Sequence, residues 1–195
     1  ESILITGIPT REDFRKEYDC NAIRDELGLP RDKQLVVALA GAYLPRPYVH
    51  FREALDKTLP YLHSLKNMHL VIVTGKDAEY ANGLRANVEE LGLENVTVLD
   101  YVERMAALMA ASNLVICKSG GLTVTECLCA RVPMILLGKA YGQENINVRT
   151  LTSLGAAMHV TTTRELVDTL RHISRNPESM QAMLINGRSE ERRVG

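Results

Sequence analysis

The chain has 195 residues, a formal net charge of -1 and a hydrophobic content of 46%. This length predicts one large domain, and the apolar fraction is sufficient for a buried core. The near-neutral charge argues against a broad nucleic-acid-binding surface, because such surfaces carry an excess of Lys and Arg.

Short apolar runs alternate along the chain with longer segments of helical period. We expect β-strands at 35–40, 70–74, 96–99, 114–117 and 134–137. We expect helices at 48–65, 78–91, 102–111, 122–130, 144–154 and 164–174. Continuously apolar strands are typical of parallel sheets buried on both faces, and strand–helix alternation indicates βαβ units. The sequence therefore predicts an α/β fold, a Rossmann-like doubly wound parallel sheet in one domain.

Several helix ends carry suitable residues. Asp77 and Glu144 are suited to cap a helix or to lie in its first turn, while Gly92 and Gly155 follow the last periodic positions as C-cap glycines.

The strongest candidate ligand loop is Lys-Ser-Gly-Gly at 118–121, between strand 114–117 and the next helix. In open parallel sheets, ligands bind beyond the carboxyl ends of the strands. Two glycines allow a close backbone approach, and a helix start offers N–H groups and a positive dipole to a phosphate. The alternative is an ordinary tight turn. Glu126, one turn further on, is placed to accept hydrogen bonds from ribose hydroxyls.

Two other loops follow predicted strands. The loop at 41–47 is rich in Gly and Pro but is not a Walker loop, because no Gly-Lys-Ser/Thr follows. The loop at 138–144 leads into Gln143 and Glu144, whose amide and carboxylate suit a hydroxyl-rich ligand such as a sugar. From the spacing alone, a solvated helix start is the more common explanation.

No metal or cofactor is predicted. The sequence has no Asp-x-Asp pair, and its five histidines lack metal-ligand spacing. The four cysteines suit reduced, packed thiols in a cytosolic protein. No apolar run approaches the roughly 20 residues that span a bilayer, and no signal peptide is found. Because the chain begins at Glu1 and ends just after a charged stretch, we expect it to be part of a longer protein.

The segments 99–137 and 141–157 resemble the C-terminal domain of glycosyltransferase family 28. The motifs that carry this resemblance are Gly-Gly-Leu-Thr-x-x-Glu, which begins at Gly120, and the downstream Gln-Glu-x-x-Asn, which begins at Gln143. The Thr-Gly-Ile-Pro-Thr-Arg run at 6–11 is similar to the connector through which these enzymes enter their second domain. The resemblance implies one half of a GT-B glycosyltransferase: a connector at 1–11, a donor domain at 12–177, and a tail or helix at 178–195 that leads out of it.

The resemblance implies a role for each matching position in binding a UDP-sugar. Glu126 matches the acid on the ribose, and Val102 matches the residue whose backbone pairs with the uracil edge. Arg11 matches a connector arginine near the base. The remaining implied contacts are Ser119, Gly120, Gly121 and Leu122 to phosphate, Gln143 and Glu144 to the sugar and its phosphate, and Gly41 and Ala42 in a first glycine loop.

Two positions depart from the family pattern. The chain has Ala-Gly-Ala-Tyr at 40–43, where many members have Gly-Gly-Ser or Gly-Gly-Gly, so the hydroxyl that would bind phosphate there is absent. Ser119 stands where many relatives have Pro, which is a smaller departure.

The resemblance implies an inverting hexosyltransferase that transfers from a UDP-sugar to a lipid acceptor without a metal. Its catalytic base is expected on an N-terminal acceptor domain outside this chain, so the isolated chain is expected to be inactive. The full-length enzyme is expected in the cytoplasm, peripheral at the inner face of the cell membrane. Gly-Ile-Pro and Gly-Gln-Glu favour diacylglycerol glycolipid synthesis. The alternatives are a peptidoglycan lipid-intermediate N-acetylglucosaminyltransferase, a non-catalytic binding subunit that needs a partner and, with less support, a UDP-sugar 2-epimerase.

Overall fold

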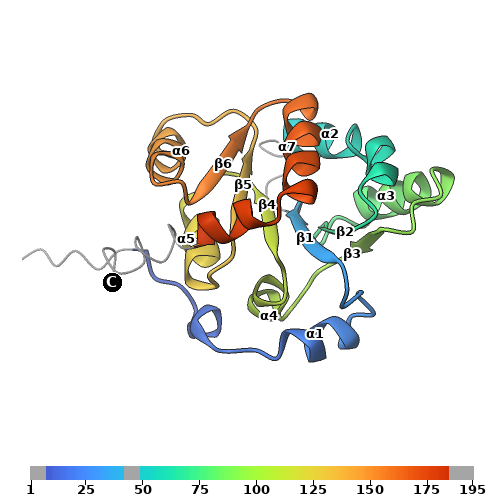
Figure 1. The fold of residues 1–195 in the computed structure, drawn as a ribbon, viewed down its shortest axis with the longest axis horizontal. Coiled ribbons are helices and arrows are strands. Elements are labelled where there is room, and N and C mark those ends of the chain that lie inside the picture. Colours follow the sequence, from blue (N-terminus) through green and yellow to red (C-terminus); the bar gives the residue numbers. More distant parts are fainter. Residues whose placement is uncertain (1–7, 42–48, 185–195) are drawn as a thin grey trace, which may run out of the picture.

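A computed structural model describes residues 8–41 and 49–184. Six parallel strands form one sheet in the order β3-β2-β1-β4-β5-β6 (Figure 1). The strands are β1 (Gln34–Leu39), β2 (Met68–Val73), β3 (Val96–Leu99), β4 (Leu114–Cys117), β5 (Met134–Leu137) and β6 (Ala157–Val160). This is the strand order of dinucleotide-binding Rossmann folds, so the predicted doubly wound parallel sheet is confirmed.

Helices cover both faces of the sheet (Figure 1). They are α1 (Cys20–Glu26), α2 (Val49–Asp56), α3 (Ala78–Glu90), α4 (Met105–Ala110), α5 (Gly121–Cys129), α6 (Gln143–Ser153) and α7 (Thr163–Arg175), with the 3-10 helices η1 (Glu12–Arg15) and η3 (Leu59–Ser64).

The core is divided by the sheet, because successive side chains of a strand point to opposite faces. In β1, Val36 packs with residues of α2, α3 and α7, while Val37 packs with residues of α4, α5 and α6. All six residues of β2 are buried. The continuous apolar runs in the sequence therefore reflect burial from two sides.

The predicted helix at 48–65 is wrong in its extent. Helix α2 ends at Asp56, and the chain continues as the 3-10 helix η3. Pro60 stands in the first turn of η3. A proline in a helix interior removes a hydrogen bond and clashes with the preceding turn, so one long helix cannot pass through this position.

Helix α1, strand β6 and the short 3-10 helix η1 were absent from the sequence prediction. Helix α1 begins after Asp19, whose carboxylate accepts from the N–H groups of Asn21 and Ala22, so a capping signal was present. Strand β6 has only four residues and includes the partly exposed His159, so the sequence shows no continuous apolar run there. It pairs with β5 and completes the sheet edge.

The residues predicted to mark the ends of α3 and α6 are confirmed, whereas the predicted helix at 102–111 begins only at Met105. The Asp77 carboxylate accepts from the Tyr80 N–H at the start of α3, and Glu144 lies in the first turn of α6. Gly92 and Gly155 have φ values of 60° and 65°, which glycine adopts without the strain of a side chain.

The segment after α7 packs on the same domain. Met180 and Met183 are 7% and 4% exposed and belong to the core cluster that contains α7. Residues 178–184 therefore contribute to this core.

Candidate functional site

The candidate site lies where the connections of the sheet change direction. Strands β1 and β4 are neighbours, and the chain runs outward from them to β3 on one side and to β6 on the other. Ligands of such sheets bind in the crevice that opens at the carboxyl ends of these two strands. The loop after β1 and the loop from β4 to α5 both begin there.

Gly41 follows β1 and lies against the next turn of the sheet. A Cβ atom at Gly41 would stand 2.6 Å from both the Gly75 nitrogen and the Thr74 carbonyl carbon. Position 41 therefore has no room for a larger residue, because the β1 loop packs directly on the turn after β2. Ala42, the other predicted residue of this loop, lies outside the described residues.

The loop between β4 and α5 presents a helix N-terminus. Gly120 is the N-cap of α5, with extended backbone angles and no capping side chain. Among the described residues, no carbonyl or side chain accepts from the N–H groups of Gly121, Leu122 or Thr123. Three unpaired donors and the helix dipole favour an anion at this position.

Two contacts join this loop to the start of α6. The Asn147 side-chain amide donates to the Ser119 carbonyl oxygen at 2.7 Å. Lys118 Nζ lies 3.8 Å from Glu144 Oε1. Ser119 is buried, whereas Gln143 is exposed at the first position of α6. The structure thus brings together the predicted phosphate loop and the predicted sugar-binding helix start.

Glu126 and Arg11 influence each other electrostatically. Burial raises the pKa of the Glu126 carboxyl, and the positive charge of Arg11 opposes that rise. Arg11 lies over the Phe14 ring, with 5.2 Å between the guanidinium carbon and the ring centroid. Thr10 Oγ1 lies 3.6 Å from Cys129 Sγ at the end of α5. The segment that precedes η1 therefore runs along α5, close to Glu126.

Val102 lies away from the loop between β4 and α5, at the other side of the sheet. It lies between β3 and α4, partly buried against the core cluster of α4, α5 and α6. Tyr101 beside it is 64% exposed, and its ring lies 5.2 Å from Lys76 Nζ. Val102 thus belongs to the carboxyl edge of the sheet, at its β3 side.

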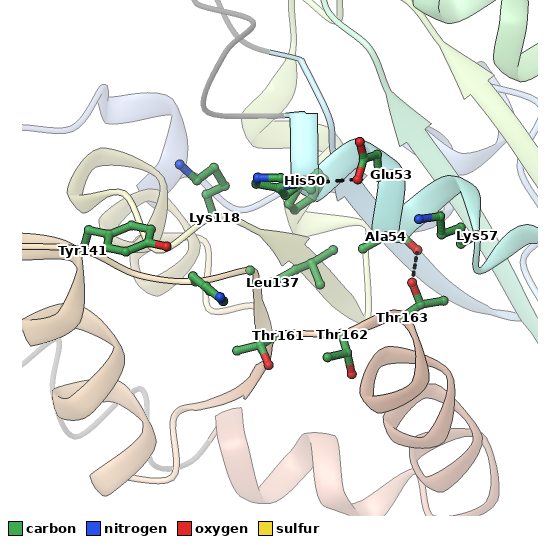
Figure 2. Close-up of a pocket in the computed structure, with 13 residues that line it drawn as sticks. His50, Glu53, Ala54, Lys57, Lys118, Leu137, Tyr141, Thr161, Thr162 and Thr163 are labelled. Atoms are coloured by element: carbon green, nitrogen blue, oxygen red, sulfur yellow. Dashed lines mark hydrogen bonds and ion pairs between the residues drawn. The ribbon is translucent and has the colours of Figure 1, made fainter.

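A cavity of about 550 Å³ opens beside Lys118 (Figure 2). Its walls come from α2, the loop after β4, the loop after β5 and the start of α7. Figure 2 shows Lys118 and His50 above the cavity, Tyr141 at one end and the Thr161 and Thr162 hydroxyls below. The lining also includes Phe51, Glu53, Ala54, Lys57, Leu137, Gly138, Lys139 and Thr163.

These lining residues were not predicted as site residues. Four of them lay in loops that the sequence did single out: Lys118 stands directly before the glycine pair, and Gly138, Lys139 and Tyr141 belong to the loop at 138–144. The others come from α2 and the residue after it, the end of β5 and the start of α7, which are distant in the sequence.

Within 8–41 and 49–184, no group of three or more His, Cys, Asp or Glu side chains is placed to hold a metal ion. Over the same residues, no helix is both long enough and apolar enough to cross a membrane.

Comparisons with known proteins identify relatives across most of the chain. Residues 49–194 match the glycosyltransferase family 28 C-terminal domain. The processive diacylglycerol beta-glucosyltransferase of Bacillus licheniformis is 28% identical over 96% of this chain and 47% of its own length. The UDP-N-acetylglucosamine–N-acetylmuramyl-(pentapeptide) pyrophosphoryl-undecaprenol N-acetylglucosamine transferase of Acetivibrio thermocellus is 30% identical, over 80% of this chain and 42% of its own length. The chain thus spans about half the length of these relatives.

Solved structures share the fold. WaaG, a glycosyltransferase involved in lipopolysaccharide biosynthesis, superposes with a TM-score of 0.73 and 19% identity over 96% of this chain and 51% of its own. HepE of Anabaena, in complex with UDP-glucose, gives a TM-score of 0.70 and 17% identity over 91% of this chain and 49% of its own. At these identities the likeness concerns the fold, which matches one half of each molecule.

Proposed function

Because the chain belongs to glycosyltransferase family 28 through its C-terminal domain, we propose that it is the donor-binding half of an inverting, UDP-sugar-dependent hexosyltransferase. In this proposal residues 12–177 hold the nucleotide sugar, and residues 1–11 connect them to an acceptor-binding half outside this chain. The whole enzyme transfers a hexose to a lipid.

The observation that carries the proposal is that the starts of α5 and α6 lie next to each other, close to the carboxyl end of β4. The N-terminus of α5 supplies unpaired N–H groups for a diphosphate, and α6 places Gln143 and Glu144 beside it. A nucleotide sugar needs this succession of contacts, because its diphosphate joins the nucleoside to the hexose. The complex of HepE with UDP-glucose supports the same ligand class for this fold.

The nucleoside end of the donor is assigned to α5 and the segment before η1. Glu126 accepts hydrogen bonds from the ribose hydroxyls, and Arg11 lies near the base. The backbone of Val102 pairs with the uracil edge, and Gly41 brings the β1 loop close to the phosphates. The positive charge of Arg11 acts on the Glu126 carboxyl, which supports the placement of these two residues at the same end of the donor.

The hexose end is assigned to the side of the cavity beside Lys118. A volume of about 550 Å³ lies within the usual range for small-molecule sites. Lys118 lines this cavity and also faces Glu144, so the cavity adjoins the start of α6.

The reaction proposed is a direct displacement. The acceptor oxygen forms a bond to the anomeric carbon while the bond from that carbon to the UDP oxygen breaks, which inverts the anomeric centre. Negative charge develops on the departing UDP, and the N–H groups of Gly121 and Leu122 stabilise it because they are already oriented. The base that takes the acceptor proton lies outside this chain, so the isolated chain binds donor and catalyses little.

A diacylglycerol acceptor is favoured for the whole enzyme. The diacylglycerol glucosyltransferase relative matches 96% of this chain, whereas the undecaprenol-linked relative matches 80% at slightly higher identity. The second relative supports the peptidoglycan alternative. Acceptors of both kinds are lipids, so the proposal includes association of the whole enzyme with a membrane surface.

Calorimetric titration of the chain with UDP tests the donor site, with ADP as the matched control. Saturable binding of UDP that exceeds ADP binding is expected, together with no sugar transfer from a UDP-hexose to diacylglycerol vesicles. Absence of heat at millimolar UDP would contradict the donor assignment. Robust turnover by this chain alone would contradict the assignment of the base to another half.

A further inference from the structure

Asn147 holds the backbone of the phosphate loop from a neighbouring helix. It is partly buried on α6, and its Nδ2 donates to the Ser119 carbonyl oxygen at 2.7 Å. The two residues are 28 positions apart, so this bond depends on the packing of α6 beside α5.

The bond restrains the direction of a neighbouring N–H group. The Ser119 carbonyl and the Gly120 N–H belong to one peptide unit, and in a planar trans peptide they point in opposite directions. No cis peptide occurs in the described part of the chain. Drawing the carbonyl toward α6 therefore directs the Gly120 N–H away from α6.

The residues after Ser119 need such a restraint. Gly120 and Gly121 have no side chains, so their backbone torsions are freer than those of other residues. The position where a Cβ would stand on Gly121 is 3.1 Å from Ile8 Cδ1 and 3.9 Å from Asn147 Nδ2. Ile8 and Asn147 thus both lie close to this glycine pair.

We propose that Asn147 is a positioning residue, which anchors the Ser119 carbonyl so that the N–H groups from Gly120 to Leu122 are aligned on the donor diphosphate. The proposal rests on the proposed function, because it assigns the diphosphate to this loop. Asn147 acts through the loop, so its loss weakens only the part of the affinity that comes from phosphate.

The test compares the Asn147→Asp and Asn147→Ala variants with the parent chain. Asp keeps the shape but removes the donor, whereas Ala removes the whole group. Affinities for uridine, UMP and UDP are measured by calorimetry, and the backbone amide signals of Gly120 and Gly121 are followed by NMR without ligand. Asn87→Ala, an exposed position of α3, is the matched control.

The expected loss of UDP affinity in Asn147→Ala is about tenfold, the scale of one hydrogen bond, with uridine affinity unchanged. Asn147→Asp is expected to lose more, because its carboxylate faces both a carbonyl oxygen and the phosphates. The Gly120 and Gly121 signals are expected to move in both variants and to stay in place in Asn87→Ala.

Unchanged UDP affinity in a folded Asn147→Ala variant would overturn the proposal. So would an equal loss for uridine and UDP, since that pattern indicates general damage to the site. If the parent itself does not bind UDP, the proposed function fails, and with it the diphosphate alignment. The ligand-free spectra would still decide separately whether Asn147 anchors the loop, because unmoved glycine signals exclude that role.

Discussion

Lys118 Nζ lies 3.8 Å from Glu144 Oε1, so a cation at the end of β4 meets an acid in the first turn of α6. The two side chains are 19% and 31% exposed. A diphosphate at the start of α5 would compete with Glu144 for this ammonium group. The pair therefore joins the two helix starts and places one positive charge beside the proposed phosphate site.

Lys118→Met is expected to weaken UDP binding about tenfold or more and to leave uridine binding unchanged, because hydrogen bonds to charged groups contribute about 1.5–3 kcal/mol. The measurement is calorimetry at two salt concentrations, where the variant should also show a weaker salt dependence. Lys66→Met, an exposed lysine between η3 and β2, is the control. Equal losses in both variants would argue against a local contact.

UDP binding is expected to be independent of divalent metal. A helix N-terminus can hold phosphate through its N–H groups, and the sequence has no Asp-x-Asp pair. Titrations with EDTA and with magnesium should agree within error. A tenfold gain in affinity with magnesium would show that the diphosphate is held differently.

Gly41→Ala is expected to destabilise the fold by about 1–3 kcal/mol, the usual cost of overpacking. The added Cβ would stand 2.6 Å from the backbone at Thr74 and Gly75, and backbone atoms cannot rotate away. Gly83→Ala is the matched control: it lies within α3 with open space around it and should stabilise by roughly 0.5–1 kcal/mol. Urea unfolding of both variants checks the opposite signs.

Gln143→Ala is expected to leave UMP affinity unchanged and to reduce the extra affinity that UDP-sugar has over UDP. Gln143 is exposed at the first position of α6, so its removal should not alter the core. Calorimetry with UMP, UDP and UDP-glucose measures the pattern. If UMP binding falls as much as UDP-sugar binding, Gln143 does not contact the sugar.

The sequence predicted most of the sheet because β2, β4 and β5 are buried along their whole length and β1 along its middle, which makes these runs apolar. The same reasoning missed β6, whose His159 is partly exposed and breaks the apolar pattern. The glycine pair at 120–121 predicted a loop that leads into a helix start, and Gly120 is the N-cap of α5. The role of this loop in phosphate binding stays a prediction. The cavity beside Lys118 was not predicted as a whole, because its walls come from α2, the loops after β4 and β5 and the start of α7, which meet only in the folded domain.

Glu126 was predicted from its place in a motif, and the structure adds an energetic consequence. Burial raises the pKa of its carboxyl, so the folded state disfavours the ionised form at neutral pH. Glu126→Gln is therefore expected to raise the melting temperature at pH 7. This gain should shrink as the pH falls through the raised pKa, because the parent carboxyl then becomes neutral as well.

A structural acid and a ribose-binding acid differ in what their loss does to ligands. If Glu126 binds the ribose, Glu126→Ala should weaken uridine, UMP, UDP and UDP-sugar by a similar factor, equivalent to about 1.5–3 kcal/mol. Uridine is the best probe of pH dependence, because it carries no phosphate that titrates in the acid range. Its affinity for the parent should fall as the pH drops through the raised pKa of Glu126, since a protonated carboxyl is a weaker acceptor, while Glu126→Gln should show a flat profile. Four unchanged affinities in a folded Glu126→Ala variant would contradict the ribose assignment, and the raised pKa would then reflect burial of a helix acid alone.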